Sequence, residues 1–270
     1  MSNPRASRGC APHRHTDRRE FMKITARTVA AGVVSYSLSL RIPKLAKGTA
    51  LESGPSADAF EEHFCNFIVN TTKCIGCGSC VRACRNENHV PGGYYRTWIE
   101  RYTESEDHEL FVDSPGGGEN GFMSAPRMKG RNPKAFFVPK LCNQCEKPAC
   151  TQVCPVSATY YTDGGVVLVD KDRCMGCGYC VQACPYEARY VDHAAGTVDK
   201  CTWCYHRITR GLPPACVLTC PTGARSFTTH VEGETCAACE LLKSERYDVL
   251  KEELGTDPQV YYLGFNREVR

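Results

Sequence analysis

The sequence lacks a long uninterrupted apolar run. Its most apolar stretch near the N-terminus, Ile24 to Leu40, is rich in Ala, Ser, Thr and Gly and is interrupted by Arg27. A membrane-spanning helix needs about 20 consecutive, predominantly apolar residues. The stretch is too short and too polar to predict a transmembrane helix.

Groupings that would give the chain its own catalytic centre are also missing. No Ser-His-Asp grouping, pair of acidic residues or phosphate-binding glycine loop argues for catalysis by this chain. The formal net charge is only +3 over 270 residues, and the basic residues are concentrated at the N-terminus. This distribution does not predict a nucleic-acid-binding surface. We therefore expect a chain that is not an enzyme by itself and has no nucleic-acid partner.

Cysteine, in contrast, is abundant, and sixteen of the twenty cysteines fall into four groups of four. The groups are Cys74, Cys77, Cys80 and Cys84; Cys142, Cys145, Cys150 and Cys154; Cys174, Cys177, Cys180 and Cys184; and Cys201, Cys204, Cys216 and Cys220. Three groups end in Cys-Pro, and the third, CMGCGYCVQACP, matches the bacterial ferredoxin run C-x2-C-x2-C-x3-C-P that binds [4Fe–4S] clusters. The four groups predict four [4Fe–4S] clusters as cofactors and electron transfer as the function.

The spacing within a group has a physical reason. Two-residue gaps let one tight loop bring three thiolates to neighbouring corners of a cubane, while the fourth cysteine points away and binds the other cluster of a pair. Gly76 and Gly78, and again Gly176 and Gly178, suit a loop whose backbone must approach the cluster closely. Backbone N–H groups in such a loop can donate to the cluster sulfurs and help to set the reduction potential.

Two other uses of cysteine are possible in principle. Pairs of C-x2-C can bind structural zinc, but such pairs usually stand a dozen or more residues apart, whereas here three cysteines fall within seven residues. A disulfide framework suits small domains without a core, whereas this chain of 270 residues is 42% hydrophobic. Iron–sulfur ligation is the favoured interpretation, and a zinc-binding structural or interaction module is the alternative from another class.

The first 40 residues predict an export signal. Arg18 and Arg19 stand two residues before Phe21 in DRREFMK, which resembles a twin-arginine signal. The weakly apolar stretch described above follows it. Clusters are assembled in the reducing cytosol, so a route that exports folded proteins with their cofactors is chemically consistent with four clusters. Whether the signal is cleaved is left open.

The remainder of the chain divides into three parts. Residues 41–59 predict a linker because Gly, Pro, Ser and Ala predominate without periodicity. Residues 60–231 predict the cluster-binding domain, with an insertion at about residues 94–134 whose early part is a strand and whose later part is a surface loop. Residues 232–270 predict a helix from Thr235 to Leu254 and an extended apolar tail that docks against another subunit.

Local repeats predict the architecture of the cluster-binding domain. Phe64 to Val69 alternates as a strand leading into the first cysteine loop. A phrase of the form Pro-x-x-Ala follows Cys154, Cys184 and Cys220, and two of these phrases lead into hairpins with turns at 163–165 and 195–196. We expect an α+β fold of two pseudo-symmetric modules, each like a bacterial two-[4Fe–4S] ferredoxin, with the inserted loop and the C-terminal helix added.

The order of the four groups, the export signal and the phrases CVQACPYEAR and DKCTWCYHR together resemble one family. This is the ferredoxin-like electron-transfer subunit of complex iron–sulfur molybdoenzymes of the tetrathionate, polysulfide and dimethyl sulfoxide reductase type. The resemblance implies that the groups pair first with fourth and second with third, and that each pair exchanges last cysteines. The implied ligand sets are Cys74, Cys77, Cys80 and Cys220; Cys201, Cys204, Cys216 and Cys84; Cys142, Cys145, Cys150 and Cys184; and Cys174, Cys177, Cys180 and Cys154.

The resemblance also implies partners and a location. The chain would relay electrons between a quinone-reactive polytopic membrane subunit and a molybdopterin catalytic subunit, on the periplasmic side of the cytoplasmic membrane, where its partner subunits would hold it. The same cluster series could instead serve a multihaem cytochrome or a hydrogenase. The terminal substrate, the direction of electron flow and the role of Cys236 and Cys239 are left open by the sequence.

Overall fold

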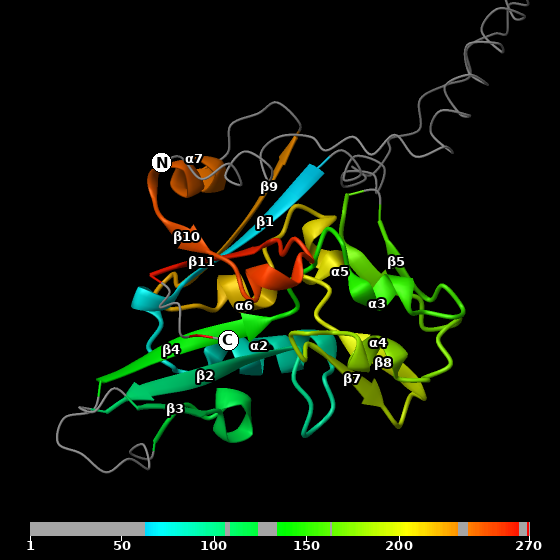
Figure 1. The fold of residues 1–270 in the computed structure, drawn as a ribbon, viewed down its shortest axis with the longest axis horizontal. Helices are drawn as coiled ribbons and strands as arrows, with labels where there is room; N and C mark the ends of the chain where they lie inside the picture. The colour runs from blue at the N-terminus through cyan, green and yellow to red at the C-terminus, as the bar shows by residue number, and fades with distance from the viewer. Residues whose placement is uncertain are drawn as a thin grey trace, which may run out of the picture.

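The computed structural model describes residues 63–105, 109–123, 134–162, 164–231, 237–264 and 269. The predicted export signal with Arg18, Arg19 and Phe21, the predicted linker and Cys236 lie outside the described residues. The described part combines short helices with four small β-sheets, which confirms the mixed helix and strand composition (Figure 1). Within it, no helix has the length and apolar character needed to cross a membrane.

The elements are short, as expected for a chain whose loops must reach toward cofactors. The helices are α2 (Ser79–Asn88), α3 (Ala149–Gln152), α4 (Tyr179–Gln182), α5 (Tyr205–Ile208), α6 (Ala215–Leu218) and α7 (Ala237–Ser244), with 3-10 helices η2 (Thr71–Lys73), η3 (Pro115–Gly118) and η4 (Glu252–Leu254). The strands are β1 (His63–Asn70), β2 (Thr97–Glu104), β3 (Leu110–Asp113), β4 (Lys134–Leu141), β5 (Thr159–Tyr161), β6 (Val167–Val169), β7 (Arg189–Asp192), β8 (Thr197–Lys200), β9 (Arg225–Val231), β10 (Tyr247–Asp248) and β11 (Val260–Leu263).

A four-stranded sheet in the order β10-β11-β1-β9 joins the two ends of the cluster-binding domain. Strand β1 pairs antiparallel with β9 and parallel with β11. On one face of the sheet, Phe67 and Phe227 pack against Trp203, with ring centroids 6.1 Å and 5.5 Å from that of the tryptophan. Because Trp203 lies between two cysteines of the fourth group, this aromatic cluster fixes the sheet against a cysteine loop.

The C-terminal tail lies inside this sheet, and the prediction that it docks on another subunit is therefore wrong for its strand. Strand β11 lies between β1 and β10, and all four of its residues are buried. The hydroxyl of Thr71 donates to the carbonyls of Leu263 (3.0 Å) and Gly264 (2.7 Å), which holds the end of the strand. The apolar character that suggested a partner is explained by the chain's own core.

The predicted C-terminal helix is also shorter than expected. Helix α7 ends at Ser244, and the chain then forms β10 and η4 before Gly255. Tyr247 pairs with Leu263 and packs edge-on against Tyr261, with ring centroids 5.3 Å apart. Pairing with a strand that arrives from later in the sequence overrides the local helical pattern.

The early part of the insertion is a strand, as predicted, but it belongs to a three-stranded sheet; the described residues 119–123 that follow η3 form no helix or strand. This early part is β2, which pairs antiparallel with β3 and β4 in the order β3-β2-β4. Residues 106–108 and 124–133 of this region lie outside the described part. The sheet forms one wall beside the first cysteine loop, since Phe137 of β4 packs near Gly76.

Other local predictions are confirmed. The strand predicted from Phe64 to Val69 is β1, and the two hairpins are β5–β6 and β7–β8, both antiparallel. Figure 1 shows β5, β7 and β8 together with α3 and α4 on one side of the molecule, and the two larger sheets on the other side. Cysteines of the first, second and fourth groups are part of the main buried core: Cys80, Cys142, Cys145, Cys201 and Cys216.

Candidate metal centres

The first three cysteines of each group share one backbone feature. The residue before the second cysteine has a left-handed conformation in all four groups: Gly76 (φ 67°), Gln144 (φ 45°), Gly176 (φ 68°) and Trp203 (φ 53°). Glycine adopts this conformation freely, but other residues adopt it at a cost of roughly 1–2 kcal/mol. The recurrence of this costly conformation at Gln144 and Trp203 indicates that the loop shape is required in every group.

Cys84, the last cysteine of the first group, lies among the cysteines of the fourth group. Burial raises the pKa of its thiol well above the ordinary value, and the nearby thiols of Cys201, Cys216 and Cys204 raise it further. The side-chain amide of Asn88 lies 3.6 Å from both the Cys84 and Cys204 sulfurs. Helix α2 therefore carries the last cysteine of the first group to the loop of the fourth.

Cys220, the last cysteine of the fourth group, lies conversely near the first. Burial raises the pKa of Cys74 to about 11, and Cys80 and Cys220 are among the charges that raise it. The fully enclosed guanidinium of Arg225 lies beside Cys80, Cys216 and Cys74, which raises the pKa of Arg225 although burial opposes its charge. Cys84 and Cys220 thus each lie near cysteines of the other group.

The last cysteine of the third group, Cys184, lies among the cysteines of the second group. Burial raises the pKa of Cys145 to about 12, and Cys142, Cys150 and Cys184 contribute in the same direction. One cavity of the protein is lined by these same four cysteines. Cys184 belongs by sequence to the third group, so the cavity collects three thiols of one group and the last thiol of another.

The remaining cysteines are Cys154, Cys174, Cys177 and Cys180. The loop after Cys154 is joined to the third group through backbone hydrogen bonds, from Asp170 N to Ala158 O (2.7 Å) and from Cys174 N to Asp170 O (3.1 Å). Backbone N–H groups also donate to these sulfurs, from Ala158 to Cys154 (3.2 Å) and from Val198 to Cys174 (3.3 Å). Cys177 is exposed, so this part of the centre faces solvent.

Buried cations without carboxylate partners in the described part of the chain surround these thiols. Arg189 and Arg225 each follow the last cysteine of a group by five residues, in the phrases CPYEAR and CPTGAR. Arg189 donates to the Cys150 sulfur at 2.9 Å. Nε of Arg189 and both Nε and Nη1 of Arg225 are buried without a hydrogen-bond partner among the described residues. Such donors suit the anionic sulfur atoms of an iron–sulfur cluster, because unsatisfied buried donors are otherwise costly.

The chemistry of the donor set therefore fits [4Fe–4S] clusters. None of the sixteen cysteines forms a disulfide bond. Burial alone favours the protonated thiol, whereas a coordinating metal removes the proton outright. The buried guanidinium groups of Arg189 and Arg225 lie where they would stabilise the resulting thiolates. Among the described residues, no three His, Cys, Asp or Glu side chains are close enough together to hold a single metal ion.

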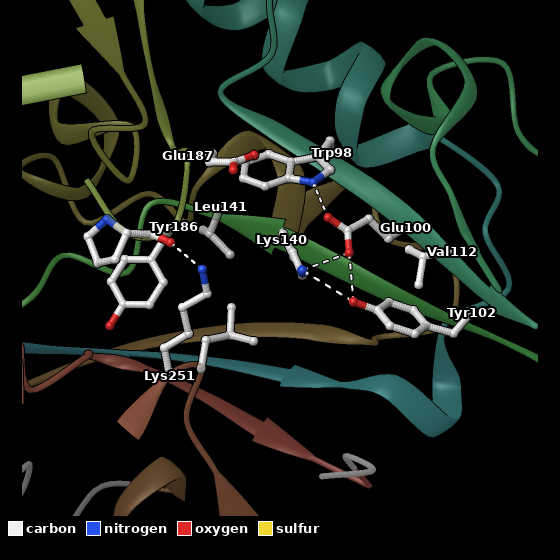
Figure 2. Close-up of a pocket in the computed structure, with 11 residues that line it drawn as sticks. Trp98, Glu100, Tyr102, Val112, Lys140, Leu141, Tyr186, Glu187 and Lys251 are labelled. Atoms are coloured by element: carbon white, nitrogen blue, oxygen red, sulfur yellow. Dashed lines mark hydrogen bonds and ion pairs between the residues drawn. The ribbon is translucent and has the colours of Figure 1, made fainter. Parts of the chain in front are cut away.

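A second cavity lies beside the turn that follows Cys184, between that turn and strands β2 and β4. Figure 2 shows Lys140 pointing into it, with its ammonium 2.7 Å from Glu100 and 3.3 Å from the Tyr102 hydroxyl. On the facing side, Lys251 donates to the carbonyl of Pro185 at 2.6 Å. The insertion and the C-terminal segment thus both support the residues that follow a cluster cysteine.

Sequence reasoning did not identify the polar residues around the sulfurs. Asn88 and Gln144 carry no motif, and Lys200 differs from a surface lysine only in its burial. A signal was available for the arginines, because the phrase Cys-Pro-x-x-Ala-Arg occurs twice. Cys239 lies in α7, apart from the four groups along the chain, and the structure assigns it no role.

Comparison with known proteins places this geometry in a family. Two segments match the 4Fe-4S dicluster domain, at residues 73–158 and 133–230. Two such domains correspond to four [4Fe–4S] clusters rather than to zinc.

Similar whole proteins are found among the electron-transfer subunits of reductases. This chain is 39% identical to the B subunit of tetrathionate reductase from Salmonella typhimurium over 200 residues, which is 74% of this chain and 72% of the relative. It is 44% identical to the B subunit of tetrathionate reductase from Archaeoglobus fulgidus, over 73% of this chain and 80% of the relative. The corresponding B polypeptide of polysulfide reductase from Wolinella succinogenes is 36% identical over 73% of this chain and 92% of its own length. The protein therefore belongs to the family of ferredoxin-like iron–sulfur B subunits found in tetrathionate, polysulfide and dimethyl sulfoxide reductases.

Proposed function

We propose that this chain relays electrons between a quinone-reactive membrane subunit and a molybdopterin catalytic subunit of a respiratory oxidoreductase, and that it performs no substrate chemistry itself. The relatives are B subunits of reductases that act on tetrathionate and polysulfide, which supports a role in such a complex. The observation that carries the proposal is the meeting of cysteines from all four groups in one connected region. Burial raises the pKa of Cys201 of the fourth group, and the nearby thiol of Cys142 of the second group raises it further.

The proposed ligand sets follow the exchanged arrangement. They are Cys74, Cys77, Cys80 and Cys220; Cys84, Cys201, Cys204 and Cys216; Cys142, Cys145, Cys150 and Cys184; and Cys154, Cys174, Cys177 and Cys180. The proximities of Cys84 to Cys204, of Cys74 to Cys220 and of Cys145 to Cys184 support the first three sets. The fourth set contains the cysteines that remain.

The protein's own groups would orient and tune the centres. A [4Fe–4S] cluster, when bound, accepts and releases single electrons at a potential that depends on its surroundings. The Asn88 amide and the Arg189 guanidinium are positioned to donate to ligand sulfurs, and backbone N–H groups of Ala158 and Val198 do the same. Hydrogen bonds to sulfur and exclusion of water both set the potential. These contacts would thereby set the relative reduction potentials of the four clusters.

We infer that the chain is exported in its folded state by the twin-arginine route and held at the periplasmic side of the membrane by its partners. The support is Arg18 and Arg19 with Phe21 two residues beyond them, in the first 40 residues. Replacing both arginines by lysine keeps the charge but not the guanidinium. The Arg18→Lys, Arg19→Lys variant is expected to remain in the cytoplasm with its clusters. Cell fractionation measures this, and unchanged export of the variant would contradict the inference.

The relay is tested on the complex isolated anaerobically from its native membranes. Molybdenum or tungsten should be recovered with this chain, and its dithionite-reduced clusters should be reoxidised when tetrathionate, polysulfide or dimethyl sulfoxide is added. The chain isolated alone should stay reduced with the same compounds, because it has no substrate site. If this chain is instead recovered with a multihaem cytochrome or a hydrogenase, and without molybdenum or tungsten, the proposed partners are wrong. Reoxidation by the isolated chain would contradict the non-catalytic role.

A further inference from the structure

Lys200 is the last residue of β8 and immediately precedes Cys201. Its side chain is fully enclosed, with 0% of the residue exposed. The ammonium donates to the carbonyl of Cys201 at 2.9 Å and to the carbonyl of Val167. Within the described residues it has no carboxylate partner. Burying an ammonium in this way is costly unless another negative group is present, since isolated buried charges are strongly disfavoured.

The ammonium lies where the two halves of the cluster-binding region meet. The carbonyl of Cys201 accepts a second hydrogen bond, from the Gln144 side chain at 2.9 Å, and Gln144 in turn accepts from the backbone of Val167 at 2.8 Å. These contacts join the loop of the fourth group to the loop of the second. Burial lowers the pKa of Lys200 and so does the neighbouring Arg189, whereas Cys142 and Cys150 of the second group and Cys201 of the fourth raise it and so favour the ammonium.

Arg189 and Arg225, the buried cations described above without carboxylate partners in the described part of the chain, differ from Lys200 in this respect. The cysteines that act most strongly on Arg225 are Cys80, Cys216 and Cys74, which all belong to the first and fourth groups. Those that act on Arg189 are Cys150, Cys142, Cys180 and Cys184, which all belong to the second and third. Each arginine therefore faces centres of one half, whereas Lys200 faces centres of both.

We propose that Lys200 is a positioning charge at the junction of the two halves, and that it raises the reduction potentials of the two clusters on either side. These are the clusters assigned to Cys84, Cys201, Cys204 and Cys216 and to Cys142, Cys145, Cys150 and Cys184, so the inference rests on the ligand sets of the proposed function. Reduction adds a negative charge to a cluster, and a fixed cation in a medium of low dielectric constant favours the reduced state. One lysine would thus favour reduction of both clusters through which an electron passes from one half to the other.

The test compares Lys200→Met with Lys243→Met, the same substitution at an exposed position of α7. Iron and acid-labile sulfide are measured first, and each protein is then titrated with dithionite at controlled potentials while EPR follows the clusters. In Lys200→Met, the reduced-to-oxidised ratio of two clusters at a fixed potential should fall at least tenfold, equivalent to about 59 mV for a one-electron couple. The other two clusters should change less, and Lys243→Met should match the unmodified protein.

Two further variants keep the test decisive. Lys200→Arg preserves the charge and should keep the potentials of the unmodified protein. Lys200→Gln removes the charge but keeps a donor for the Cys201 carbonyl, and it should lower the same two potentials as the methionine variant. Full iron content with unchanged potentials in the neutral variants would overturn the inference, as would failure of both neutral variants to load clusters that Lys200→Arg loads. Fewer than four clusters in the unmodified protein would instead refute the proposed function.

Discussion

Replacing Cys142 and Cys184 together by alanine is expected to remove one cluster and leave the other three unchanged. The two residues belong to different sequence groups but line the same cavity, so both are assigned to one centre. Loss of two ligands should abolish that centre. The iron content should fall from about sixteen to about twelve atoms per chain, because a cubane holds four irons. Iron analysis and the EPR spectrum of the reduced protein measure the result.

The matched variant replaces Cys177 and Cys184, which belong to the same sequence group but to different proposed centres. It removes the same number of thiols and should disturb two clusters, through lower iron content or through conversion of cubanes into three-iron centres. Ligands that act on one shared centre give non-additive losses, whereas ligands of separate centres give independent ones. The opposite pattern, with one cluster lost in this variant and two in the first, would contradict the exchange of last cysteines.

A Gly78→Ala variant is expected to lose stability by about 2–4 kcal/mol, combining left-handed strain with overpacking. Gly78 has φ 75°, and a methyl group there would overlap the backbone carbonyls of Gly118 and Glu119. Both carbonyls already accept hydrogen bonds, that of Gly118 from the Gly121 N–H (3.1 Å) and that of Glu119 from Arg82. Heating the anaerobic protein and following cluster absorbance should give a clearly lower midpoint.

Gly223→Ala separates strain from overlap. Gly223 has φ 63°, in the same left-handed region, but a methyl group there would meet no atom within 4 Å among the described residues. This variant should lose only about 1–2 kcal/mol, the cost of the left-handed conformation alone. Equal midpoints for the two variants would show that overlap with the Gly118 and Glu119 carbonyls adds no cost to the left-handed strain.

The sequence predicts those features that local spacing encodes. Cysteine spacing predicts sixteen ligand residues, several of which the structure brings close together across sequence groups, and alternation identified β1 and both hairpins. The left-handed conformations of Gln144 and Trp203 could not be predicted from residue type, because neither residue favours it. They become visible only by comparison with Gly76 and Gly176 at the equivalent positions.

Features that depend on long-range pairing were mispredicted or missed. Strand β11 pairs with β1 across nearly the whole described chain, so its apolar tail suggested a partner subunit instead of its own core. The sheet β3-β2-β4 is likewise built from segments separated by residues of weak pattern. Lys200 could not be recognised, because its burial comes from loops distant in sequence. The same holds for Asn88, which reaches Cys204 from another group.

The most direct test of the four-cluster relay is the amount of iron and acid-labile sulfide per chain in protein purified without air, together with its EPR spectrum before and after dithionite. Four cubanes predict about sixteen irons and about sixteen sulfides, with the coupled signals of several reduced clusters. Zinc with little iron, and no EPR signal after reduction, would contradict the relay and leave the cysteines as ligands of a structural metal.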